Sequence, residues 1–118
     1  MRKTSLLAII PFLLLLCATA ADAHAMLERA EPRVGNKVAS PPREVTLWFT
    51  QKLETAFSTI TVTNAKGERV DTGKTRVSGN QMSIGLRPGG AGTYRVNWHV
   101  LSTDTHRTDG SFSFQVAQ

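Results

Sequence analysis

The sequence predicts an all-β fold, a small antiparallel sandwich of about seven short strands. Segments in which apolar and polar residues alternate recur along the chain after residue 24. Turn-forming residues, mainly Gly, Pro and Asn, separate these segments at short intervals. No segment after residue 24 has the apolar period of a helix of useful length. Short alternating strands with frequent turns are typical of an immunoglobulin-like architecture.

The first 23 residues resemble a secretory signal peptide rather than part of a fold. Two basic residues, Arg2 and Lys3, precede an apolar run over 6–16 that is too short to span a bilayer as a stable helix. The run is followed by Ala21-Asp22-Ala23, which offers small residues to a signal peptidase. We therefore expect a signal peptide over 1–23, cleavage after Ala23, and one exported domain over 24–118.

The domain over 24–118 must fold without disulfides. The only cysteine, Cys17, lies in the predicted signal peptide, and Leu16 stands before it where a lipoprotein signal needs a small residue. We therefore expect neither lipidation nor a disulfide, and stability must come from the hydrophobic core. A core of sufficient size is feasible for a domain of this length.

Five segments have the alternation of half-buried strands, after a first short strand within "AMLERAEP". They are 44–50, 57–64, 81–86, 93–101 and 110–116. On each segment one face is apolar. The residues expected to face the core are Val45, Leu47, Phe49, Ile60, Val62, Met82, Ile84, Leu86, Tyr94, Val96, Trp98, Val100, Phe112, Phe114 and Val116.

Between these strands lie segments with strong turn chemistry. Gly67 in "NAKGER" is available for a positive φ, and "RPGGAG" at 87–92 breaks any regular element. The segments "DTGK" at 71–74 and "SGN" at 78–80 are predicted to punctuate two shorter edge strands.

The charge pattern argues against nucleic-acid binding. Without residues 1–23 the chain has twelve Lys and Arg residues and eight Asp and Glu residues, which gives a formal charge of +4. The basic residues are scattered, with no basic run interleaved with aromatic residues. A surface of mixed charge is the simpler interpretation, and we expect no nucleic-acid partner.

Histidine and aspartate residues are the candidates for chemistry, since the domain lacks cysteine. Asp104 and His106 are two residues apart, and on an extended backbone such side chains point to the same side. If cleavage leaves His24 as the first residue, its free α-amine and its imidazole Nδ1 can chelate one metal ion. Together these groups form a set of three nitrogens and one oxygen, which suits Cu(II), although Zn(II) accepts similar ligands.

The remaining candidates are less suited to a metal site. His99 is expected to face outward from the strand that carries Trp98, and Asp109 is expected to serve the turn that starts the next strand. Met26 and Met82 are the only methionines after residue 23, too few for a thioether Cu(I) site.

Over residues 24–118 the chain resembles the CopC family of periplasmic copper-binding proteins. The resemblance rests on "HAMLERAEPRVGNKV", on "PPREVTLWFTQKLE" and most specifically on "RPGGAGTYRVNWHVLSTDTHRTDGSFSFQV". It implies a Greek-key β-barrel or sandwich that binds Cu(II) through His24, Asp104 and His106. It also implies a periplasmic role in copper homeostasis or resistance, with a CopD-like inner-membrane copper transporter as partner.

Two departures from the family pattern bear on this expectation. The chain lacks the methionine cluster of members that also bind Cu(I), so it resembles a Cu(II)-only member. Gln51 stands where the family often has a glutamate, which leaves hydrogen bonding around the metal ligands in doubt.

Two other functions compete with a non-enzymatic, monomeric copper-binding protein. Polysaccharide monooxygenases also bind copper through an amino-terminal histidine. However, most aromatic residues of this short domain are expected in the core, and Asp104 as a ligand would occupy a position that O2 needs. The other alternative is a metal-free immunoglobulin-like structural module.

Overall fold

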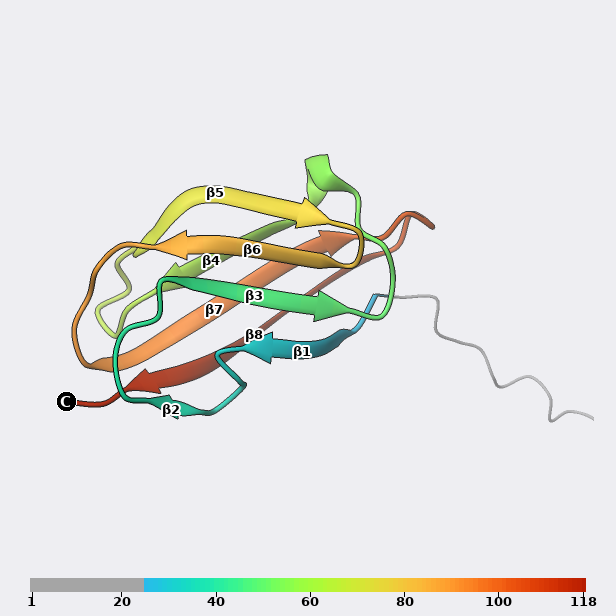
Figure 1. The fold of residues 1–118 in the computed structure, drawn as a ribbon. Helices are drawn as coiled ribbons and strands as arrows, with labels where there is room; N and C mark the ends of the chain where they lie inside the picture. The colour runs from blue at the N-terminus through green and yellow to red at the C-terminus, as the bar shows by residue number, and fades with distance from the viewer. Residues whose placement is uncertain (1–24) are drawn as a thin grey trace, which may run out of the picture.

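In a computed structural model, residues 25–118 form a β-sandwich of two four-stranded sheets (Figure 1). The predicted signal peptide and His24 lie outside the described residues. The all-β sandwich predicted from the alternating segments is confirmed.

One sheet has the strand order β1-β3-β6-β5, with all neighbours antiparallel. Its strands are β1 (Leu27–Glu31), β3 (Glu44–Phe49), β5 (Asp71–Ser78) and β6 (Gln81–Leu86). The other sheet has the order β2-β8-β7-β4. Its strands are β2 (Lys37–Val38), β4 (Thr59–Thr63), β7 (Gly92–Leu101) and β8 (Arg107–Val116).

The structure has eight strands rather than about seven because β2 is a short additional element. Its two residues pair with the end of β8 in parallel, so the second sheet is mixed rather than purely antiparallel. A two-residue strand has no periodicity that a sequence could reveal.

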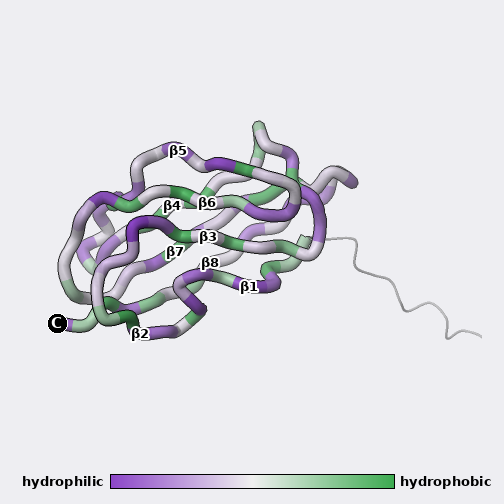
Figure 2. Tube along the Cα trace, in the orientation of Figure 1, coloured by the Kyte–Doolittle hydropathy of each residue, from purple (hydrophilic) through white to green (hydrophobic). Residues whose placement is uncertain are grey.

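The core lies between the two sheets and consists of the residues predicted to face inward. Hydrophobic and hydrophilic residues alternate along the strands in Figure 2. Of the predicted core residues, all are buried except Leu86, which is partly buried and packs against the core. The indole ring of Trp98 in one sheet and the phenyl ring of Phe49 in the other meet edge to face, with ring centroids 5.1 Å apart. This contact joins the two sheets.

Two local predictions were wrong. Phe57 was expected in a strand, but it ends the 3-10 helix η2 (Thr55–Phe57) and its exposed fraction is 61%. The segment "DTGK" was expected to be a turn, but it begins β5. There Gly73 has a φ of +84° and the register shifts between Asp71 and Thr75, so the glycine permits a bulge within the strand.

Side chains of β5 cover the edge of β4 where the sheets meet. The backbone amide of Val62 donates to Asp71 Oδ2 at 2.8 Å, and that of Ile60 donates to Thr75 Oγ1 at 3.1 Å. Asp71 is buried and also pairs with Arg69 at 2.8 Å. These bonds satisfy amides that an edge strand would otherwise leave open to another chain.

Candidate metal centre

The turn that joins β7 to β8 carries both predicted metal ligands of the described chain. The strands remain paired as far as Leu101 and Arg107, so residues 102–106 must reverse the chain. The Ser102 amide donates to the His106 carbonyl at 3.0 Å, and the Thr105 amide donates to the Ser102 carbonyl at 2.8 Å. Thr105 has a φ of +73°, in the left-handed region. Asp104 and His106 therefore lie on a turn, and the expected extended backbone was wrong.

The turn nevertheless brings the two side chains together. His106 Nδ1 lies 3.2 Å from Asp104 Oδ1, and the side chains are 47% and 36% exposed. A carboxylate and an imidazole are thus adjacent and open to solvent. Nitrogen and oxygen donors in this combination suit borderline divalent ions.

Asp104 is held through one of its two carboxylate oxygens. The hydroxyl of Ser102, which is fully buried, donates to Asp104 Oδ1, and the His106 amide lies 3.4 Å from the same oxygen. The His106 imidazole also approaches this oxygen, with Nδ1 at 3.2 Å. The carboxylate is therefore oriented by contacts within the turn that carries it.

These contacts also keep Asp104 ionised. The hydrogen bond from the Ser102 hydroxyl is the main cause that lowers the pKa of Asp104 below its ordinary value; burial opposes it, and contacts with His106 lower the pKa further. An ionised carboxylate is the form that coordinates a metal ion.

The turn is anchored to the segment that follows β3. The Thr103 amide donates to the Lys52 carbonyl at 3.0 Å, and Ser102 forms an isolated bridge with Leu53. Gln51 is half-buried next to these residues. The turn is thus held against this segment by backbone hydrogen bonds, which favours a fixed arrangement of Asp104 and His106.

The described chain begins at the same end of the molecule (Figure 1). Ala25 is fully buried, and its carbonyl accepts a hydrogen bond from Thr108 Oγ1 at 2.8 Å. Thr108 is two residues beyond His106 on β8. The residue bonded to Ala25 is His24, which lies outside the described residues, so its ligand role stays a prediction.

The other candidates lie away from this turn. His99 is exposed on the outer face of β7, as predicted, where it stands opposite Thr59 and Asp109 on the neighbouring strands. Asp109 lies within β8, not at its start. Met82 is buried in the core, as predicted.

Between Ala25 and Gln118 no group of three or more His, Cys, Asp or Glu residues could hold a metal ion. Asp104 and His106 alone supply two donors. A stable copper site at this turn therefore needs further ligands, and the adjacent chain start is the place from which they could come.

Sequence reasoning missed the hydroxyl groups around the turn. Ser102 and Thr108 each stand two residues from a predicted ligand, within "STDTHRT". The spacing can be seen in the sequence. However, the contact of the Ser102 hydroxyl with Asp104 depends on the shape of the turn, and the contact of the Thr108 hydroxyl with Ala25 depends on the approach of the segment that leads into β1. Neither could be read from the local sequence.

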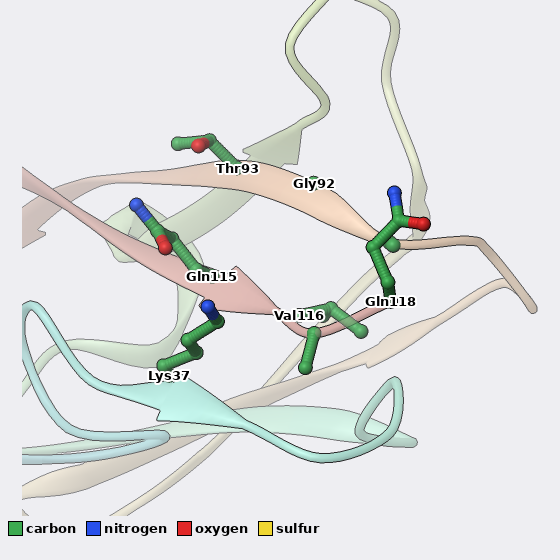
Figure 3. Close-up of a pocket in the computed structure, with 8 residues that line it drawn as sticks. Lys37, Gly92, Thr93, Gln115, Val116 and Gln118 are labelled. Carbon is green, nitrogen blue, oxygen red and sulfur yellow. The ribbon is translucent and has the colours of Figure 1, made fainter.

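A shallow hollow lies at the opposite end of β7 and β8 from the turn that carries Asp104 and His106. Figure 3 shows Lys37, Gly92, Thr93 and Gln115 around it, and its volume is about 220 Å³. No His, Asp or Glu side chain is among the described residues that line it. This hollow lacks the donors of a metal site.

No helix in the part of the chain that the structure describes is long and apolar enough to cross a membrane.

Comparisons with known proteins point to one family. The sequence profile of the CopC domain matches residues 27–117. Copper resistance protein C of Xanthomonas campestris pv. juglandis is 34% identical over 110 residues, which cover 86% of each chain.

Solved structures agree with this match. CopC from Methylosinus trichosporium OB3b superposes with a TM-score of 0.71 and 29% identity, over 80% of this chain and 94% of that one. PcoC, a methionine-rich copper resistance protein from Escherichia coli, gives a TM-score of 0.69 and 33% identity, over 80% and 99%.

Proposed function

The chain belongs to the CopC domain family, and from this membership we propose that it binds Cu(II) through His24, Asp104 and His106. The similarity to proteins named for copper resistance supports copper as the metal. The protein holds Cu(II) as its cargo and serves either the delivery or the cellular uptake of copper in copper homeostasis.

One observation carries this proposal. The exposed Asp104–His106 pair, with its atoms 3.2 Å apart, lies at the end of the sandwich where the chain enters the fold. The Thr108–Ala25 hydrogen bond ties that chain start to β8 directly after the turn. Residue 24 is bonded directly to Ala25, one Cα–Cα step of about 3.8 Å away, so the proposed ligand His24 directly precedes this anchored chain start.

The ligand types favour Cu(II) over Cu(I). The α-amine and imidazole of His24, the carboxylate of Asp104 and the imidazole of His106 form a nitrogen and oxygen set of the kind that Cu(II) prefers. A Cu(I) site would need several thioethers. Of the two methionines among residues 25–118, Met82 is buried in the core, which leaves Met26 alone at the surface.

The amine ligand requires export. The peptide nitrogen of residue 24 is an amide in the precursor and becomes an amine only when cleavage follows Ala23. Copper binding is therefore tied to the periplasm, where the mature protein acts as a monomer and exchanges copper with a CopD-like inner-membrane transporter.

Extension of the amino terminus tests the chelate. Protein that begins at His24 is compared with protein that carries one additional alanine before it. The extension removes the terminal amine but keeps Asp104, His106 and the His24 imidazole. We expect Cu(II) affinity to fall at least about tenfold, about 1.4 kcal/mol, in a competitive titration. Equal affinities, or a mature terminus at another residue by mass spectrometry, would overturn the amino-terminal chelate.

The protein is not an enzyme under this proposal. Asp104 as a ligand occupies a coordination position that an oxygen-activating copper centre leaves open. Ascorbate-driven oxidation of chitin or cellulose should therefore not exceed that of free copper. Turnover well above free copper would favour a monooxygenase instead.

A further inference from the structure

The peptide group between Ala25 and Met26 is held on both of its polar sides by threonine hydroxyls. The Ala25 carbonyl accepts from Thr108 Oγ1 at 2.8 Å, and the Met26 amide donates to Thr50 Oγ1 at 2.9 Å. The backbone amide of Thr50 in turn donates to the Met26 carbonyl at 2.9 Å. Thr50 follows β3 in one sheet and Thr108 belongs to β8 in the other.

These bonds fix more than two atoms. A peptide group is planar, so a carbonyl and an amide held on opposite sides define the plane and the positions of both flanking Cα atoms. The Cα of Ala25 is one of them, and its side chain is fully buried, so it cannot swing into solvent. Only the backbone dihedrals of Ala25 then separate residue 24 from a fixed frame.

Thr108 is an unusual residue for its position. Along β8, Phe112, Phe114 and Val116 share its face and are buried in the core. A half-buried hydroxyl on this face is satisfied by the Ala25 carbonyl. Valine has nearly the same shape and would fill the site equally well, so packing alone does not require a hydroxyl.

We infer that Thr108 and Thr50 are positioning residues that clamp the Ala25–Met26 peptide and so fix the point, next to the Asp104–His106 turn, at which the chain that carries the proposed ligand His24 enters the fold. This inference rests on the proposed copper function and names the residues that make the amino terminus a preorganised ligand. A frayed terminus would lose its conformational entropy at the moment of copper binding. With the clamp in place, this conformational entropy is already lost when the protein folds, before copper binds.

The test uses Thr108→Val, which removes only the hydroxyl, in protein that begins at His24. Thr108→Ser returns the hydroxyl and serves as the rescue. Thr61→Val is the matched control, because Thr61 is also half-buried on a strand but has no side-chain hydrogen bond among the described residues. Thr50→Val removes the other half of the clamp.

The first measurement needs no copper. Exchange of the Met26 amide hydrogen, followed by NMR in the metal-free protein, should be about fivefold faster in Thr108→Val and faster still in Thr50→Val. Thr108→Ser and Thr61→Val should match the wild type. An unchanged exchange rate in Thr108→Val would overturn the clamp itself.

The second measurement is Cu(II) affinity by competitive titration, with electron paramagnetic resonance of the loaded protein. Thr108→Val should bind about fivefold more weakly with a broadened spectrum, and Thr108→Ser should recover the affinity to within about twofold. Faster Met26 exchange with unchanged affinity and spectrum would overturn the positioning role.

Failure of the copper function itself is recognised separately with His106→Ala. If that variant binds Cu(II) as tightly as the wild type, the ligand set is wrong, whatever the threonine variants do. If it loses copper while Thr108→Val does not, the ligand set stands and the clamp is overturned.

Discussion

Two aspartates of this molecule have lowered pKa values but are used in opposite ways. Asp71 is buried and accepts four hydrogen bonds, two at each oxygen, from Arg69 and from the Val62 and Gly73 amides. Asp104 is about one-third exposed, and its Oδ1 accepts a hydrogen bond from the Ser102 hydroxyl. The difference teaches that a shifted pKa does not identify a functional carboxylate, whereas an oriented carboxylate that solvent can reach does suit a ligand role.

The physical causes of the two shifts also differ. Burial on its own would raise the pKa of Asp71, and the Arg69 side chain and the two amides outweigh it to give a net lowering. For Asp104 the Ser102 hydroxyl is the main cause and burial is a smaller opposing effect. The first carboxylate is a closed structural unit and the second remains accessible.

The largest expected effect is that of pH, which should separate the two regions. Imidazole and amine nitrogens coordinate copper only when they are deprotonated, so protons compete with copper for the proposed nitrogen ligands as the pH falls. Apparent Cu(II) affinity should decrease at least about a thousandfold between pH 7 and pH 5, or about 4 kcal/mol. Electron paramagnetic resonance at several pH values would follow the release.

Fold stability should be unaffected over that range. Because folding lowers the pKa of Asp71, its contribution is complete above the unfolded-state pKa of about 3.9 and is lost as the pH falls below it. Urea titrations at pH 7 and pH 5 should therefore give free energies of unfolding that differ little on account of Asp71. Copper retained at pH 5 would contradict the three-nitrogen site.

The next effect is on stability and comes from the buried carboxylate. Asp71→Ala leaves the Val62 amide without its acceptor and removes the partner of Arg69, so we expect a loss of about 3 kcal/mol in the free energy of unfolding. Cu(II) affinity of the remaining folded protein should be unchanged. A stability loss below about 0.5 kcal/mol would show that β4 and β5 do not depend on this carboxylate.

The reverse pattern is expected for the exposed pair. His106→Ala removes one proposed imidazole ligand and should weaken Cu(II) binding about a hundredfold, or about 2.7 kcal/mol, in a competitive titration. Its free energy of unfolding should change by less than about 0.5 kcal/mol, because the side chain is about half exposed. The matched control is His99→Ala, an exposed histidine on β7, which should bind copper normally. Wild-type affinity in His106→Ala would exclude the proposed ligand set.

Much of the sandwich could be predicted because alternation directly reports burial. Val45, Leu47 and Phe49 face the core since side chains of a strand alternate between faces. β5 could not be predicted in this way. Its sequence carries turn-forming residues at 71–74, and it becomes a strand because its backbone pairs with β6, while Asp71 and Thr75 also bond the edge of β4 across the sandwich.

That the two candidate ligands Asp104 and His106 come together was predicted, but their geometry was not, and their role as ligands stays a prediction. Asp104 and His106 do meet, yet through a turn that depends on the left-handed Thr105 and on backbone bonds of Ser102 rather than through an extended strand. The anchoring of Ala25 to Thr108 joins residues 83 positions apart, which no local pattern encodes. The role of His24 remains a prediction.

The smallest expected effect concerns Ser102, whose hydroxyl orients Asp104. In Ser102→Ala the carboxylate loses its main donor, and its pKa should return toward the ordinary value of about 3.9. At pH 7 it is still ionised, so only its orientation is weakened. Water can replace the lost donor, because Asp104 is partly exposed, whereas the Asp71 carboxylate is buried and water cannot replace its donors in the same way. We therefore expect Cu(II) affinity to fall only about threefold, about 0.65 kcal/mol, in the same titration as His106→Ala. Ser102→Thr, which keeps a hydroxyl, is the matched control. A loss as large as that of His106→Ala would mean that the orientation of Asp104, and not merely its charge, governs the site, and would place Ser102 beside the ligands in importance.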